Sequence, residues 1–184
     1  MERRHHRCGR DDAGPIVQLT RVAVLWNPAN EVHPRMLDET VIAAQALGLQ
    51  VQRVPARGLE DYASAFAAMA RERAEALIVL GADLPSFFHR THINELASRH
   101  RLPTMYAIRE HAESGGLMSH GPDVSDAYRG AATYVHRILS GGRPGDLPIQ
   151  QPTKFELVIN LKTAKDLGLT IPASVLGRAD QVIQ

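Results

Sequence analysis

The sequence predicts an α/β fold: a mainly parallel, Rossmann-like sheet with helices on both faces. Three observations support this prediction. Continuous apolar runs at 22–26 and 76–80 have the composition of buried parallel strands. Segments with apolar residues at helical spacing separate the runs, so that strands and helices alternate from Arg21 onward. Polar or glycine-containing loops follow the strands, as expected where a parallel sheet meets a ligand.

The first half of the chain has clear boundary signals. Pro34 suits the first turn of a helix, where its missing N–H is no loss, and Gly48 suits the residue after that helix. Apolar and polar residues alternate in 49–54, which predicts a strand with one exposed face at the sheet edge. The expected elements are strands at 22–26, 49–54 and 76–80, and helices at 34–47 and 59–74.

The second half continues the alternation. Asp123 is a suitable N-cap for a long helix, and the apolar residues of that helix predict a buried stripe. Gly168 suits the end of a short helix near the C-terminus. The expected strands are 103–108, 116–119 and 155–160, the expected helices are 87–99, 124–139 and 162–167, a Pro- and Gly-rich connector spans 143–153, and a final turn begins at Pro172.

Composition narrows the classes of function. The chain has 184 residues, the size of one ordinary domain, with 21 basic and 20 acidic residues. This near balance, with only 5% aromatic residues, argues against nucleic-acid binding. A single cysteine, Cys8, excludes an internal disulfide. No apolar stretch approaches the roughly 20 residues of a membrane span.

Residues 1–20 have the composition of a disordered tail. They are charged and then contain Gly14 and Pro15, with no apolar segment typical of a signal peptide. As written, the chain is therefore expected to stay in the cytoplasm. His5, His6 and Cys8 do not define a tetrahedral metal site, and we expect no bound metal.

Polar residues gather after the strands, which predicts a ligand cleft. Known catalytic and cofactor signatures are missing: there is no GxSxG, HExxH, Walker loop or GxGxxG, so we expect neither an enzyme nor a cofactor. Asp83 alone suggests the phosphoacceptor of a receiver domain, but the acidic pair expected after the first strand is replaced by Asn27 and Pro28. The residues after strands are Asn27, Pro28, Asn30, Gly81, Asp83, Arg109, Glu110, Ser119, Gly121 and Asn160.

Four stretches carry a resemblance to a known family. The segments 22–30 (VAVLWNPAN), 65–77, 115–119 (GGLMS) and 151–165 (QPTKFELVINLKTAK) resemble substrate-binding proteins of bacterial ABC transporters. These are members of the type I periplasmic-binding-protein fold, related to the tryptophan- and tyrosine-binding lipoproteins. The resemblance runs from Arg21 to the C-terminus.

The resemblance implies a two-lobe protein that closes on a small solute and delivers it to an ABC transporter permease. Residues 21–184 would form the C-terminal lobe, preceded by a tail, 1–20, that does not match the family. The family implies a periplasmic location, and a secretion signal and first lobe are expected ahead of Arg21. The segment 116–142 would belong to that missing first lobe, so that in this chain it would pack locally, exchange between chains in a dimer, or stay loosely held.

The resemblance also implies the ligand-contacting residues. For an amino acid, Arg109 would hold the carboxylate, Asp83 or Glu110 the ammonium, and an aromatic residue would stack on the side chain. A hinge ion pair is an equal interpretation of Arg109 with Glu110, and Phe87 fits a core role as well as a contact role. The candidates are Asn27, Pro28, Asn30, Asp83, Phe87, Tyr106, Arg109, Glu110 and Ser119.

One alternative function comes from another class. A cytoplasmic domain that senses a small molecule or binds a partner can use the same fold, as sugar-responsive repressors do. Residues 1–20 contain no helix-turn-helix, so this chain could not read DNA alone.

Overall fold

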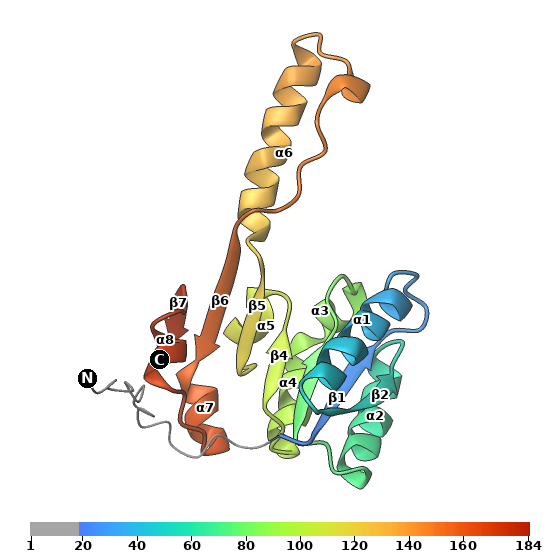
Figure 1. The fold of residues 1–184 in the computed structure, drawn as a ribbon, viewed down its shortest axis with the longest axis vertical. Coiled ribbons are helices and arrows are strands. Elements are labelled where there is room, and N and C mark those ends of the chain that lie inside the picture. The colour runs from blue at the N-terminus through green and yellow to red at the C-terminus, as the bar shows by residue number, and fades with distance from the viewer. Residues whose placement is uncertain (1–18) are drawn as a thin grey trace, which may run out of the picture.

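The fold of the chain is known from a computed structural model that describes residues 19–184 (Figure 1). Two expectations, a disordered tail at 1–20 and the absence of a metal site at His5, His6 and Cys8, concern residues that lie almost wholly outside this range.

Seven strands form one sheet in the order β2-β1-β3-β4-β5-β6-β7. All neighbouring strands are parallel except β5 and β6, which are antiparallel. The expected mainly parallel α/β sheet is confirmed, as is the placement of the second strand at its edge. The strands are β1 Arg21–Trp26, β2 Gln50–Pro55, β3 Ala76–Val79, β4 Thr104–Tyr106, β5 Met118–Pro122, β6 Phe155–Asn160 and β7 Gln181–Ile183.

Helices cover both faces of the sheet. Alternate residues of β1 point to opposite faces: Ala23 and Leu25 join the core beneath α2 and α4, while Val24 packs with Leu37 of α1. Both faces are buried in this part of the sheet, which explains the continuous apolar runs. The helices are α1 His33–Ala46, α2 Leu59–Arg71, α3 Leu84–Phe88, α4 Arg90–Arg99, α5 Arg109–Glu113, α6 Val124–Leu139, α7 Leu161–Leu167 and α8 Ala173–Leu176, with a 3-10 turn at Pro144–Asp146.

Several element boundaries differ from the expectations. The helix expected at 87–99 is two helices, because α3 ends at Phe88 and His89 leaves the helical conformation before α4 begins. The fourth strand is shorter than expected, the fifth lies two residues later, and β7 was not predicted. Three residues are too few to give β7 a periodic signal.

Residues 123–154, which we call the arm, leave the sheet after β5 and return to it at β6 (Figure 1). α6 extends away from the sheet, and no residue of α6 is buried. The predicted buried stripe is therefore wrong: Tyr128 is 75% exposed and Leu139 is 82% exposed. Periodicity identifies the apolar face of a helix but does not show that anything covers it.

The strand within the segment 116–142 belongs to the main sheet. β5 pairs with β4 on one side and β6 on the other, so only the part after Pro122 leaves the sheet. Assignment of the arm to another lobe stays a prediction.

Candidate functional site

The order of the strands reverses between β1 and β3. The chain goes from β1 outward to β2, then crosses back to β3 and continues to β4 and β5 on the other side. The loops that follow β1 and β3 therefore leave the same edge of the sheet in neighbouring positions. In open α/β sheets this arrangement creates a crevice outside the carboxyl ends of the strands.

A buried hydrogen bond joins the two loops. The side-chain amide of Asn27, after β1, donates to Oδ1 of Asp83, after β3, at 2.9 Å. The other carboxylate oxygen of Asp83 accepts from the backbone N–H of Ser86 at 3.0 Å and caps α3. The side-chain oxygen of Asn27, Oδ1, accepts from the backbone N–H of Ala29 at 2.9 Å. Asn27 and Asp83 thus lie at the predicted edge, but they bind each other.

His33 is a second link between these loops, and the sequence analysis missed it. The backbone N–H of Asn27 donates to Nδ1 of His33 at 2.8 Å, and Nε2 lies 2.7 Å from the carbonyl oxygen of Gly81. Because Nδ1 accepts, Nε2 must carry the ring proton and donate to Gly81. The side chain is buried. No local signal could have identified it, since Gly81 lies 48 residues away in sequence.

The outer part of the two loops remains accessible. Pro28 is exposed and Asn30 is half-buried. The side chain of Asn30 donates to the carbonyl oxygen of Ala82 at 2.6 Å, so it too joins the loops. Ala82 has φ of 59°, a left-handed conformation that costs energy for a non-glycine residue and is often found at functional sites.

Apolar side chains of α3 lie at the same edge. Phe87 is half-buried, with its ring 5.0 Å from the guanidinium carbon of Arg90 and 6.1 Å from the ring of His111. Leu84 and Phe88 are four residues apart on α3 and are 70% and 69% exposed. Phe87 thus packs against its neighbours but stays partly accessible, so its contact with a ligand stays a prediction, while Leu84 and Phe88 offer exposed apolar surface.

Two predicted contact residues lie in the core instead. Tyr106 is 2% exposed, donates its hydroxyl to Oδ1 of Asn94, and stacks on His111 at 4.6 Å between ring centroids. Burial raises the pKa of the Tyr106 hydroxyl. Ser119 pairs with Tyr106 across β4 and β5 and is 1% exposed. Both side chains lie in the core of the described structure, and a contact of either one with a ligand stays a prediction; the Ser119 hydroxyl has no hydrogen-bond partner among residues 19–184.

Asn160 also differs from expectation, because β6 runs antiparallel to β5. Its strand ends at the opposite edge of the sheet, where the Asn160 amide donates to the carbonyl oxygen of Ala112 at 3.0 Å and caps α7. It does not belong to the set of residues at the ligand edge.

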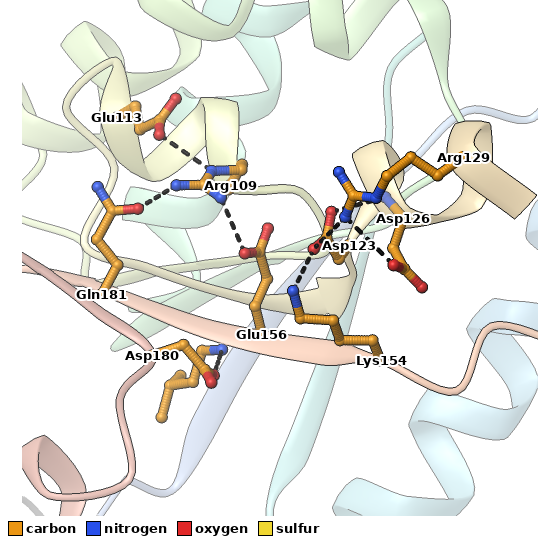
Figure 2. Close-up of polar contacts among 10 residues, drawn as sticks. Arg109, Glu113, Asp123, Asp126, Arg129, Lys154, Glu156, Asp180 and Gln181 are labelled. Carbon is orange, nitrogen blue, oxygen red and sulfur yellow. Dashed lines mark hydrogen bonds and ion pairs between the residues drawn. The ribbon is translucent and has the colours of Figure 1, made fainter.

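Arg109 is the centre of an ion-pair network that ties α5 to β6 and β7 (Figure 2). Its Nε donates to Glu113 at 3.1 Å, one terminal nitrogen donates to Glu156 at 2.9 Å, and the other donates to the side chain of Gln181. Burial raises the pKa of the Glu156 carboxyl, and the charge of Arg109 opposes that shift. Arg109 therefore forms ion pairs, but with Glu113 and Glu156 and not with Glu110, the partner that the hinge interpretation gave it.

Glu110 lies beside Arg109 in the first turn of α5 and is half-buried. Its Oε2 is buried and has no hydrogen-bond partner among residues 19–184. A buried carboxylate oxygen without a donor is costly, so this group is suited to accept a hydrogen bond from a bound molecule.

A second ion-pair cluster lies where the arm meets the sheet (Figure 2). Nζ of Lys154 is 2.7 Å from Oδ2 of Asp123, whose other oxygen caps α6 by accepting from the N–H of Asp126 at 3.0 Å. Arg129 lies 3.8 Å from Asp123 and 3.2 Å from Asp126. The hydrogen bond from Lys154 lowers the pKa of the Asp123 carboxyl. The contact of Lys154 with Asp123 joins the two ends of the arm, and the others lie within the first turns of α6.

Three further possibilities can be checked in residues 19–184: a metal site, a membrane span and a receiver-domain phosphoacceptor. Among residues 19–184 no group of three or more His, Cys, Asp or Glu side chains could hold a metal ion. No helix in the same range is long and apolar enough to cross a membrane. The receiver-domain alternative finds no support, because both oxygens of Asp83 are engaged in buried hydrogen bonds.

Comparison with known families gives one match. The family described as ABC transporter substrate binding protein matches residues 15–183. The chain belongs to the ABC transporter substrate-binding protein family. The resemblance seen in the sequence is thereby confirmed, and this family is one of solute-binding proteins rather than of enzymes. A comparison with curated proteins found no match.

Solved structures share the fold of this family member. A conserved domain protein from Vibrio cholerae O1 biovar El Tor has a TM-score of 0.83 and 28% identity, covering 91% of this chain and 56% of that one. An ABC domain in complex with L-Trp from Streptococcus pneumonia has a TM-score of 0.82 and 25% identity, covering 90% and 55%. A ligand-free, open substrate binding protein from Clostridium difficile, with adhesive properties, has a TM-score of 0.68 and 16% identity, covering 91% and 55%, and shows the fold alone. The chain thus spans a little over half the length of each.

Proposed function

We propose that this chain is a solute-binding component of a bacterial ABC importer that takes a small solute with an ammonium group, such as an amino acid. The solute binds at the carboxyl edge of the sheet, against the loops that follow β1 and β3. It is enclosed when a second lobe closes over this edge, and an ABC permease on the outer side of the cytoplasmic membrane then receives it. The protein binds and releases the solute without turnover.

The main support for this proposal is the position of the loops that follow β1 and β3. β1 and β3 flank the point where the strand order reverses, the place where ligands bind in open α/β sheets. Three side chains, Asn27, Asn30 and His33, fasten one loop to the other. Such fastening fixes the crevice before the ligand arrives, which lowers the cost of ordering on binding.

The charged side chains at the proposed site favour binding of a ligand's ammonium group over binding of its carboxylate. All three nitrogens of Arg109 are engaged within the protein, and both oxygens of Asp83 accept buried hydrogen bonds. Glu110 differs from them, because its buried Oε2 accepts no hydrogen bond from any group in residues 19–184. We assign to Glu110 the contact with the ammonium.

The apolar surface of α3 favours an aromatic or aliphatic side chain on the solute. Leu84 and Phe88 are exposed at the same edge. One structural neighbour holds L-Trp, which makes tryptophan the first ligand to test.

The test compares three indole compounds by amide chemical shifts in NMR. L-tryptophan and tryptamine carry an ammonium, while indole-3-propionate carries only a carboxylate. We expect the first two to shift the amides of residues 27–32 and of Glu110, with fast exchange, and the third to shift neither. Glu110→Gln should abolish these shifts, and the control Glu95→Gln, on the exposed side of α4, should retain them. Equal shifts from all three compounds would contradict the role of Glu110, and no shifts from any amino acid would contradict the site.

A further inference from the structure

We propose that His33 is a pH-sensitive link at the proposed solute site: when its ring gains a proton, the loops after β1 and β3 come apart and the solute is released. This inference concerns the regulation of that site and rests on the proposed function. His33 is the first residue of α1 and is 1% exposed. Its side chain is therefore enclosed within the described structure, whatever else covers the edge of the sheet.

Only the neutral ring can make both contacts of His33, which together we call the His33 link. Nδ1 accepts from the backbone N–H of Asn27 at 2.8 Å, and Nε2 donates to the carbonyl oxygen of Gly81 at 2.7 Å. A protonated imidazole carries a hydrogen on both nitrogens and accepts on neither. Its Nδ1–H would face the N–H of Asn27, two donors without an acceptor, so the contact with the loop after β1 would be lost.

A water molecule has little room to replace this contact. His33 and Asn27 line a cavity of about 10 Å³, which Trp26 and Ser86 also line. This volume is at the lower limit for a single water, which would also need two or more polar partners. A proton on Nδ1 would therefore lack an acceptor as long as the loops keep their present positions.

Two other titratable side chains line the same cavity, Tyr62 of α2 and Asp83 of the loop after β3. Burial, followed by the charge of Asp83, raises the pKa of the Tyr62 hydroxyl to about 12, so it stays neutral. Asp83 attracts a cation, but its two oxygens are held by hydrogen bonds from Asn27 and Ser86. The N-terminal end of α1, where His33 lies, opposes a cation. A protonated His33 therefore has no ready partner in place of Asn27.

Loss of the His33 link loosens the loop against which the solute is proposed to bind. The backbone of Asn27 bonds to His33 and its side chain bonds to Asp83, so the two contacts fix the same residue. Besides the Asn27–Asp83 pair, the solvent-exposed bond from Asn30 to Ala82 also joins the loops. With the His33 contact broken, the crevice is less ordered before binding, and ordering it then costs affinity. By linkage, a bound solute should in turn disfavour protonation of His33.

The first test needs no solute. Long-range ¹H–¹⁵N NMR spectra of the 184-residue protein report the tautomer and protonation of each imidazole, and amide spectra report the two loops. Between pH 7.5 and 5.0 we expect His33 to change from the neutral ring with a proton on Nε2 to the imidazolium. The amides of Asn27 and Gly81 should shift along the same titration curve. A ring that stays neutral to pH 5.0, or that gains a proton while the Asn27 amide does not move, would overturn the proposal.

The second test measures the affinity for tryptamine, whose ammonium group stays charged over this pH range. We expect binding to be about fivefold weaker at pH 5.0 than at pH 7.5. His33→Asn should remove this dependence, because Oδ1 of an asparagine can accept from the Asn27 N–H and does not titrate. The matched control, His92→Asn on α4, makes the same substitution away from the loops and should keep the full loss of affinity.

The outcomes distinguish this proposal from the proposed function. An equal loss of affinity at pH 5.0 in His33→Asn and in the unsubstituted protein would overturn the role of His33 but leave the solute site in place. If tryptamine bound at neither pH, the proposed function would fail and acid release with it, and the first test would still show whether acid breaks the His33 link. If circular dichroism showed that His33→Asn does not fold, the first test would decide, because it uses the unsubstituted chain.

Discussion

The side-chain amide of Asn27 donates a hydrogen bond of 2.9 Å to the carboxylate of Asp83, from one side of the strand-order reversal to the other. Both residues are buried, and 56 residues of chain separate them. Their bond makes the two loops at the proposed solute site one unit, so loss of either partner should affect folding and ligand binding together.

We therefore expect Asn27→Ala to destabilise the protein by about 1–3 kcal/mol, because it leaves a buried carboxylate oxygen of Asp83 without a donor. Urea denaturation measures the change. Asn30→Ala is the matched control: it removes a bond between the same loops, but one that is solvent-exposed. If the two variants lost equal stability, the buried bond would not be the important link.

Stability should depend on the protonation of His111. Burial, followed by the nearby charge of Arg90, lowers the pKa of His111 from 6.5 to about 4. Between these values the unfolded chain binds a proton at this residue and the folded chain does not, so stability rises with pH there. The slope is at most about 1.4 kcal/mol per pH unit.

Denaturation curves at several pH values between 4 and 6.5 test this dependence, with His111→Gln expected to flatten the slope. His92, which is half exposed on α4, provides the control substitution, His92→Gln, and should leave the slope unchanged. If the free energy of unfolding of His111→Gln depended on pH as steeply as that of the unsubstituted protein, groups other than His111 would cause the dependence.

Gly121 should tolerate no side chain. A Cβ at this position of β5 would lie 1.8 Å from the carbonyl oxygen of Ala107, which is backbone and cannot turn aside. We expect Gly121→Ala to cost at least about 1–3 kcal/mol, the usual range for overpacking. The control is Gly145→Ala, where a Cβ meets nothing within 4 Å and the thermal midpoint should hardly move.

Asp123 has two separable roles at the base of the arm. Its carboxylate caps α6 and pairs with Lys154. Asp123→Asn keeps an oxygen for the cap but loses the ion pair, whereas Asp123→Ala loses both. Hydrogen exchange at the N–H of Asp126 should therefore be much faster in Asp123→Ala than in Asp123→Asn.

The same pair predicts a response to acid. Because the pKa of the Asp123 carboxyl is lowered in the folded protein, its contribution to stability is complete above its ordinary pKa and falls as pH drops through the lowered value. NMR titration of the Asp123 carboxyl measures this. An unshifted titration would show that Lys154 does not hold it in solution.

The sequence predicted the strands better than the side chains at the site. Val22–Trp26 and its partners were identifiable because burial on both faces leaves a continuous apolar run. The edge that Asn27 and Asp83 occupy followed from the ends of those runs. Their mutual hydrogen bond did not, because pairing across 56 residues leaves no local pattern.

Tyr106 and Ser119 show the limit of reasoning from strand ends. Neighbouring residues of a strand point to opposite faces, and neither points along the strand toward the edge. Being last in a short strand therefore does not by itself bring Tyr106 to the crevice; in the described structure it packs under α4 and α5. Arg109 was placed correctly, but its partners Glu156 and Gln181 lie 47 and 72 residues away.

The two ends of the arm lie next to each other, since the N–H of Asp123 donates to the carbonyl oxygen of Lys154 at 3.0 Å. Beyond them, β5 and β6 continue as an ordinary antiparallel pair. A two-residue hairpin turn in place of residues 123–154 would therefore connect β5 to β6 without altering the path of either strand. The same junction offers a place to graft a new recognition element above the proposed solute edge.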